Sequence, residues 1–280
     1  MKSYIVRLDS AYENSSEWEK AFVTNNKLNN YVYMDPDNSS KLLYQDIAKY
    51  LNLQEDRIQG LTGKFVYTIS LDPFGIQIQD DENNTWFLKS DQLGFSAIGG
   101  IYQAYIDKSD NKERARKRVS KWIFESRSIG GIFLWPMDWM NDGRWNSNPQ
   151  YNKTRGTGRM QDRVDLTLLD IRNCFFKVKN SWLGKQYNER PYMKKWIDHF
   201  GEGEEGFNRY LEFFTFNSFI ENGYPKDLVI EGNVVTDFWN DQYKSPLCEY
   251  KYKEIEGILS KLNTWIVERS NQIEAIMNEI

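Results

Sequence analysis

Histidine and cysteine are scarce in this sequence. Its 280 residues include one histidine, His199, and two widely separated cysteines, Cys174 and Cys248. A zinc site of familiar spacing needs clustered histidine and cysteine ligands, so none is expected. A Ser–His or Cys–His nucleophile would have to use His199, which we expect on a helix surface instead. Both cysteines are expected to be reduced, half-buried thiols of a cytosolic protein.

Long apolar runs and nucleotide-binding glycine motifs are also missing. No run approaches the roughly 20 apolar residues of a membrane helix, and the start, MKSYIVRLDS, has no signal-peptide core. We therefore expect a soluble cytoplasmic protein with no membrane partner. Neither a P-loop nor a GxGxxG motif after a strand occurs. The net charge of −4 and the pI of about 5.3 argue against a surface that is basic throughout, but they allow a local basic patch.

Aromatic residues, in contrast, are abundant. Ten Trp, 17 Tyr and 16 Phe predict a core built largely from rings. The mean hydropathy of −0.70 indicates a very polar surface around that core.

The apolar periodicity predicts an α+β protein. Alternating patterns predict strands at residues 2–8, 63–72, 74–80 and 84–90, and a brief apolar strand or core segment at 132–135 that Pro136 ends. Helical patterns predict helices at residues 16–28, 39–53, 110–127, 161–176, 190–200, 206–220 and 250–277. An acidic loop is expected around Gly201 and Gly203.

These elements favour one α+β domain over residues 1–280. A small antiparallel β-meander in the first half packs against a mainly helical second half. No repeat or linker divides the chain, although a subdivision into a strand-rich part, 1–95, and a helical part, 96–280, is the alternative.

The polar start of the helix expected at 161–176 is the first candidate site. Asp162 and Asp165 lie three residues apart and share one helix face. They could hold Mg²⁺ or Mn²⁺ or serve as acid and base, with Arg155 and Arg163 clamping an anion beside them. The structural alternative is that Asp at a helix start satisfies unpaired N–H groups and the helix dipole, while Arg163 neutralises the charge.

A basic helix face is the second candidate. Arg114, Lys117, Arg118 and Lys121 share one side of the expected helix, with Trp122 at its edge. Such residues can grip a phosphate backbone and stack on a base. The alternative is a solvated face whose charge nearby glutamates partly compensate.

An aromatic loop is the third candidate. Trp135, Trp139, Trp145 and Tyr151 lie in or beside an irregular stretch rich in Asn and Gly, residues 137–158. Aromatic anchors on a polar loop suit a binding surface. Equally, the rings could fold back onto the core.

Several motifs in the second half occur in a fixed order. They are Ile129-Gly130-Gly131, Phe133 to Pro136, Thr154-Arg155-Gly156, Asp162 to Leu168, Ile171-Arg172, Arg209-Tyr210, Asp227-Leu228-Val229 and Ser245-Pro246-Leu247. From roughly residue 120 to residue 275, the chain thereby resembles a bacterial family, the domain of unknown function 6994. The resemblance implies no reaction or cofactor. It implies a shared pattern that includes Arg155, Asp162, Arg163, Asp165 and Thr167.

The leading hypothesis is a cytoplasmic, non-enzymatic protein that binds a macromolecule, with phage–host conflict as its setting. A protein partner or a homo-oligomer is expected, and no cofactor. Arg155, Arg163 and Thr167 join the aromatic loop as binding candidates. The alternative is a metal-dependent enzyme acting on nucleic acid or a nucleotide through Arg155, Asp162 and Asp165. A third hypothesis is passive nucleic-acid binding through the basic helix face.

Overall fold

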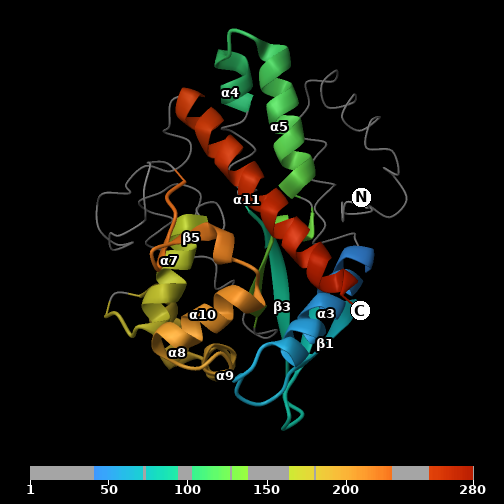
Figure 1. Ribbon diagram of the computed structural model, residues 1–280, viewed down its shortest axis with the longest axis vertical. Helices are drawn as coiled ribbons and strands as arrows, with labels where there is room; N and C mark the ends of the chain where they lie inside the picture. The colour runs from blue at the N-terminus through green and yellow to red at the C-terminus, as the bar shows by residue number, and fades with distance from the viewer. Residues whose placement is uncertain are drawn as a thin grey trace.

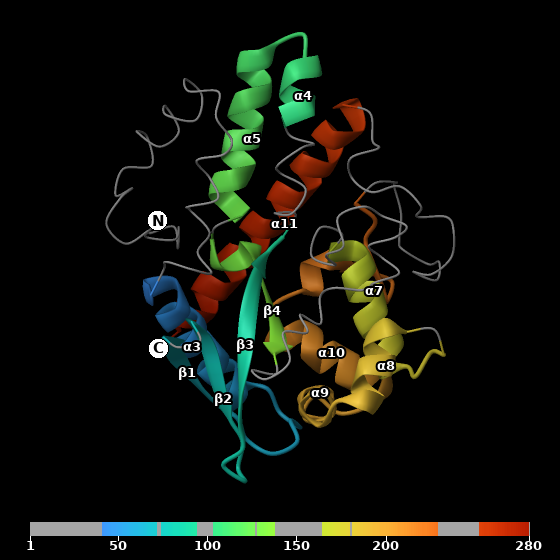
Figure 2. The same cartoon turned by 180° about the vertical axis from the view of Figure 1, so that it is seen from behind.

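An antiparallel sheet and a larger set of helices make up the fold of the computed structural model (Figures 1 and 2). The structure describes residues 41–71, 74–93, 103–126, 128–137, 164–179, 181–228 and 252–279. The elements of its first half are α3 (Lys41–Arg57), β1 (Val66–Leu71), β2 (Phe74–Gln79), β3 (Thr85–Gln92), α4 (Gln103–Lys108), α5 (Lys112–Ser126), η4 (Ile129–Gly131) and β4 (Ile132–Met137). Those of its second half are α7 (Val164–Phe175), α8 (Trp182–Glu189), α9 (Pro191–Asp198), α10 (Gly203–Phe213), η6 (Asn217–Phe219), β5 (Ile220–Glu221), β6 (Tyr224–Pro225) and α11 (Tyr252–Asn278).

The predicted α+β class is confirmed. The strands β1 to β4 form one antiparallel sheet in sequence order, and the second half is mainly helical. The long helix α11 passes diagonally in front of the sheet in Figure 1, while α7 to α10 gather beside it. Among the described residues, no helix has both the length and the apolar character needed to cross a bilayer. The strand predicted at 2–8 and the helix predicted at 16–28 lie outside the described residues.

Buried side chains form continuous rows across the sheet. Tyr67 of β1 lies opposite Ile78 of β2, which lies opposite Trp86 of β3. In a parallel row, Ile76 lies opposite Leu88. All five side chains are buried. The alternation of apolar residues therefore predicted correctly which residues face the core.

The prediction that Pro136 ends the apolar segment at 132–135 was wrong, because β4 continues through it to Met137. Pro136 pairs with Leu88 at the end of the sheet order, where β4 has one strand neighbour among the described residues. The main chain of Ile132 faces away from β3, since its carbonyl accepts a hydrogen bond from Arg269. Pro136, four residues on, has the same orientation, so its missing N–H costs the sheet no hydrogen bond.

Side chains of α3 occupy the outer edge of β1. The Asn52 amide donates to the Tyr67 carbonyl at 2.7 Å and accepts from the Tyr67 N–H at 3.0 Å. One helical turn further on, Glu55 accepts a hydrogen bond from the N–H of Phe65 at 2.8 Å. The helix is therefore attached to the sheet by hydrogen bonds as well as by apolar contacts.

Two glycines allow η4 to lie directly against α11 and the end of α5. A Cβ atom at Gly130 would stand 2.4 Å from the Ile266 carbonyl oxygen and 2.3 Å from the Ser270 Oγ of α11. At Gly131, it would stand 2.1 Å from the Ser126 carbonyl oxygen. The Ile-Gly-Gly motif of the sequence therefore marks a contact too close for any side chain.

Arg269 of α11 is a buried cation at the same contact, with 3% of its surface exposed. Its guanidinium donates to the carbonyls of Gly130, Ile132 and Phe214 at 2.7–2.8 Å. The ring of Phe216 lies 4.1 Å from the guanidinium carbon. Burial lowers the pKa of Arg269 to about 10, so the group still carries its charge at neutral pH.

Aromatic rings fill the space where the sheet meets the helices, as the composition predicted. The members of this cluster include Phe65, Tyr67, Trp196, Phe200, Tyr210, Phe213, Phe214, Phe216 and Phe219. Neighbouring rings meet mostly edge to face or at a tilt, with centroids about 5–6 Å apart, which is the arrangement that ring quadrupoles favour.

The predicted acidic loop near Gly203 was wrong, because α10 begins at that residue. Glu204 and Glu205 lie in its first turn, where acidic side chains stabilise the positive end of the helix dipole. The helix predicted at 206–220 also ends early, at Phe213. Thr215 follows with a φ of +56°, a left-handed conformation that cannot continue the helix.

Candidate functional site

The helix α7, which contains the first candidate cluster, is surrounded by protein. Eleven of its twelve residues are buried, Arg172 being the exception. The sequence predicted an amphipathic helix with Val164, Leu168 and Ile171 inside, and those three residues are buried. The polar residues on its other sides are buried as well, so each needs a partner within the protein.

Asp165 is 1% exposed, and its carboxylate accepts a hydrogen bond from the N–H of Leu228 at 3.1 Å. It thereby joins the motif Asp162 to Leu168 with the motif Asp227-Leu228-Val229, since Asp165 and Leu228 are 63 residues apart. Thr167 is also fully buried. The hydrogen bond from Leu228 joins Asp165 to a distant main-chain group and not to the N–H groups of its own helix start, which the structural alternative expected.

The rest of that cluster, Arg155, Asp162 and Arg163, lies outside the described residues. No group of three or more described His, Cys, Asp or Glu residues is placed to hold a metal ion. The pairing of Asp162 with Asp165 as a metal site or an acid–base pair therefore stays a prediction.

The aromatic loop likewise stays a prediction. Trp139, Trp145 and Tyr151 lie outside the described residues. The backbone of Trp135 belongs to β4, where it pairs with Lys89 of β3.

The basic helix face is present on α5, but without its aromatic member. Trp122 has none of its surface exposed, so it cannot stack on a base as the sequence suggested. It faces the core because it lies one turn beyond buried Val119. Arg118 forms an ion pair with Glu256 of α11, and Lys117 pairs with Glu113 at 3.2 Å.

The expectation that His199 lies on a helix surface was wrong. His199 is 1% exposed and stacks on Phe65, with ring centroids 3.9 Å apart. Its Nδ1 lies 2.9 Å from the Thr62 carbonyl, which can only accept, so Nδ1 carries a hydrogen. Its Nε2 lies 3.1 Å from a Glu55 carboxylate oxygen that also accepts from the Tyr67 hydroxyl. These contacts make His199 a buried link between α9, α3 and β1.

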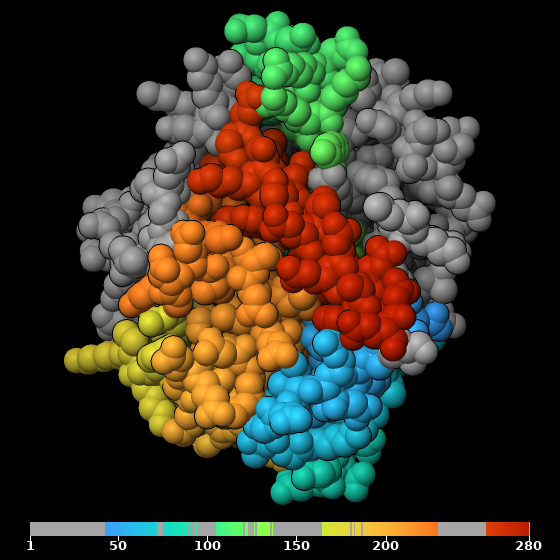
Figure 3. Space-filling view, in the orientation of Figure 1, coloured from blue at the N-terminus to red at the C-terminus, as the bar shows by residue number. Residues whose placement is uncertain are grey.

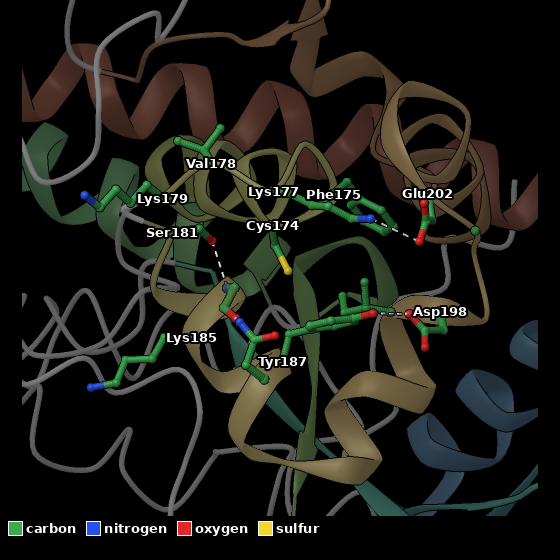
Figure 4. A pocket seen from close by; sticks show the side chains of 14 residues that line it. Cys174, Phe175, Lys177, Val178, Lys179, Ser181, Lys185, Tyr187, Asp198 and Glu202 are labelled. Atoms are coloured by element: carbon green, nitrogen blue, oxygen red, sulfur yellow. Dashed lines mark hydrogen bonds and ion pairs between the residues drawn. The ribbon is translucent and has the colours of Figure 1, made fainter.

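A pocket of about 950 Å³ lies between the α7–α8 turn, α8 and the end of α9 (Figure 4). Its volume is within the range of ligand and peptide sites. The sequence analysis did not predict it. The lining consists of Cys174, Phe175, Lys177, Val178, Lys179, Ser181, Gly184, Lys185, Tyr187, Asn188, Ile197, Asp198, Gly201 and Glu202.

Charge is distributed unevenly around this pocket. In Figure 4, Lys179 and Lys185 lie on one side, Asp198 and Glu202 lie on the other, and Cys174 lies between. Lys177 reaches across to Glu202, with 3.2 Å between Nζ and Oε1. The pocket therefore presents a basic side and an acidic side, with Cys174, Phe175 and Ile197 as its buried apolar floor.

The acidic side is held in place by hydrogen bonds. The Tyr187 hydroxyl donates to Asp198 at 2.6 Å, and Lys194 forms an ion pair with the same carboxylate. Burial raises the pKa of Tyr187, and the hydrogen bond to Asp198 raises it further, so the phenol stays protonated at neutral pH.

Cys174 provides a thiol at the floor of the pocket; it is free, and it is buried where the sequence suggested a half-buried thiol. Cys248 lies outside the described residues. Burial raises the pKa of the Cys174 thiol from 9.0 to about 12, and the charges of Asp170 and Asp198 add to the effect. The thiol is therefore protonated at neutral pH and is a poor nucleophile.

Alkylation tests this protonation state. Each pKa unit changes the thiolate fraction tenfold, so Cys174 should react with iodoacetamide about a thousandfold more slowly in the folded protein than in the urea-unfolded chain. Mass spectrometry of the Cys174 peptide measures both rates, and the folded rate should still rise with pH beyond 9. Equal rates in the two states would contradict the assignment.

Residues 176–179, here called the rim, expose apolar side chains between lysines; Lys177, Val178 and Lys179 line the pocket, and Phe176 lies next to them in the chain without lining it. Phe176 and Val178 are 38% and 41% exposed, and Lys177 and Lys179 alternate with them. The Arg172 guanidinium lies 4.2 Å from the ring centre of Phe176. The exposed ring is thus held in position by a cation–π contact.

Sequence reasoning missed this rim although the run FFKVK carries a signal. Apolar residues alternate with lysines directly after a helix, which is unusual for a solvated loop. Whether Phe175 or Phe176 faces outward depends on tertiary packing, and here Phe175 is buried while Phe176 is exposed.

Comparison with known proteins places the chain in one family. A family model described as "Family of unknown function (DUF6994)" matches residues 18–273. The match extends well beyond the part, roughly 120–275, that the sequence motifs indicated. No curated protein and no solved structure gives a significant match. Since the family model covers most of the sequence, the chain belongs to this family of unknown function, DUF6994.

Proposed function

We propose that this protein is a cytoplasmic, non-enzymatic binding protein that contacts a protein partner through the pocket between α7, α8 and α9. The observation that carries the proposal is Val178, which lines the pocket and is 41% exposed, with the exposed ring of Phe176 two residues before it in the chain. Exposed apolar side chains grouped at a concave site are typical of protein interfaces.

The rim is organised before a partner arrives. Arg172 lies between the rings of Phe176 and Tyr224, 4.2 and 4.1 Å from their centres, and its Nε donates to the Gly223 carbonyl at 2.9 Å. An aromatic anchor that is already fixed loses little conformational entropy on binding. Phe176 therefore suits the role of a binding anchor.

The chemistry of the pocket indicates what the partner presents. An apolar side chain of the partner would occupy the floor near Phe175 and Ile197, which are buried. An acidic group next to it would face Lys179 and Lys185 on the basic side. Complementary charge of this kind raises the association rate and selects the orientation of the partner.

We further propose phage–host conflict as the setting, as the sequence analysis suggested. The corresponding expectation is that the partner recovered from infected cells is a phage protein or a host protein that phages target.

Substituting the rim tests the proposal. Val178→Ser and Phe176→Ala should each weaken partner binding at least about tenfold, because an interface anchor contributes 1.4 kcal/mol or more. Partners captured by the wild-type protein from infected-cell lysate would be identified by quantitative mass spectrometry. The recombinant partner would then be titrated against each variant by calorimetry.

The matched control is Val267→Ser. Val267 is 39% exposed on α11, nearly the same as Val178, but it does not line the pocket. It should leave binding unchanged, and thermal unfolding should confirm that all variants fold. A partner whose affinity is the same for Val178→Ser, Phe176→Ala and wild type would remove the pocket from the proposal.

A further inference from the structure

A second surface, on α5, lies away from the pocket and goes beyond the proposed function. The pair α4 and α5 forms one end of the long axis of the molecule, while α8 and α9 lie toward the other end (Figures 1 and 2). In the space-filling view, α4 and α5 stand at the top of the molecule (Figure 3).

The charge of α5 is opposite to that of the whole chain. Its sequence, KERARKRVSKWIFES, contains six basic and two acidic residues, on a chain with a net charge of −4. Ala115, Val119 and Trp122 are buried and attach the helix to the protein. Arg114, Lys117 and Lys121, spaced three and four apart, are exposed and form a basic stripe on the outer side.

The first turn of α5 strengthens this positive field. Asn111 caps the helix by accepting a hydrogen bond from the N–H of Arg114 at 2.9 Å. Lys112 and Arg114 therefore stand at the positive end of the helix dipole, where cations are unfavourable, and Glu113 is the one acidic residue of this first turn. Of the residues that the structure describes, none forms an ion pair with Arg114. Arg114 is therefore available to an anion near the start of the helix.

We propose that the outer face of α5, made by Arg114, Lys117 and Lys121, binds the phosphate backbone of a nucleic-acid duplex, with Lys117 exchanging its exposed ion pair with Glu113 for a phosphate contact. The face contains side chains that reach phosphates and, with Trp122 in the core, its described residues offer no ring that stacks on an unpaired base. Recognition therefore depends on charge, independent of base sequence.

The test uses the full chain and a fluorescein-labelled DNA duplex of mixed sequence, followed by anisotropy at several salt concentrations. The logarithm of the binding constant should fall linearly with the logarithm of salt concentration. The double substitution Arg114→Gln and Lys117→Gln should weaken binding and reduce that slope by about 1.8, since each phosphate contact contributes about 0.9.

The control removes the same charge elsewhere. Lys49 and Lys64 are exposed on and near α3, so the double substitution Lys49→Gln and Lys64→Gln has the same net charge as the α5 variant. It should leave both the affinity and the slope close to wild type. The proposal would be overturned by any of three results: no binding to the duplex, equal losses in both variants, or tighter binding to single-stranded DNA than to the duplex. Partner binding at the pocket is measured separately, so either proposal can fail alone.

Discussion

Replacing Gly130 with alanine should destabilise the protein by about 3 kcal/mol or more. The new Cβ atom would stand 2.4 Å from a main-chain oxygen of Ile266 and 2.6 Å from the main-chain nitrogen of Ser270. Main-chain atoms of a long helix cannot rotate away, so α11 would have to move from η4 as a unit. The free energy of unfolding, from urea titrations of both proteins, measures the effect.

Gly257→Ala is the matched control. Gly257 lies in α11, the helix that Gly130 contacts, and a Cβ atom at Gly257 would meet nothing within 4 Å. Alanine favours a helix interior by up to about 1 kcal/mol over glycine, so this variant should be as stable as wild type or more so. If Gly130→Ala behaved like Gly257→Ala, the close contact of α11 with η4 would be wrong.

Replacing Arg269 with methionine should cost about 3–5 kcal/mol of folding free energy. Methionine fills a similar space but donates no hydrogen bond, so the carbonyls of Gly130, Ile132 and Phe214 would lose the donors they now share. Removing one partner of a buried polar contact costs far more than the net contribution of that contact. Thermal and urea unfolding measure the loss.

Two further variants separate the hydrogen bonds from other effects. Glu268→Met changes the neighbouring exposed residue and should stay within about 0.5 kcal/mol of wild type. Arg269→Lys keeps the charge but not the planar donor group, so its stability should fall between wild type and Arg269→Met. A fully stable Arg269→Met would show that these carbonyls need no donor.

Local patterns were sufficient to predict the sheet and most helices. Ile76 and Ile78 alternate with glutamines in the sequence, and a period of two residues has only one compact solution, a half-buried strand. The final helix was placed within two residues of its observed bounds because its apolar period persists over 27 residues. The prediction at Pro136 was wrong because a proline interrupts a strand only where its missing N–H would face the neighbouring strand.

The burial of His199 could not be predicted, because its partner Glu55 lies 144 residues away. A histidine between Asp198 and Phe200 is compatible with either surface or core. Only the folded chain brings a carbonyl and a carboxylate to its two ring nitrogens. The same reasoning applies to Asp165, whose partner is the main chain of Leu228.

The candidate site was predicted least well. Of the residues proposed from sequence on α5, Arg114, Lys117 and Lys121 are exposed as expected, whereas Arg118 is half-buried and Trp122 is in the core. The pocket at the α7–α8 turn escaped prediction because a pocket is a property of the gap between helices. Its lining comes from residues 174–202, none of which forms a recognisable motif alone.

The Asn52 side chain at the edge of β1 also affects how copies of the protein can associate. The outer strand of a sheet offers unpaired main-chain groups, and a strand from another molecule can add to them. At Tyr67 those groups are already occupied, at 2.7 and 3.0 Å, by an amide that imitates one residue of a neighbouring strand. An incoming strand would have to displace Asn52 and Glu55 before it could pair with this part of β1. A short polar segment of α3 thus blocks strand addition at this part of the β1 edge.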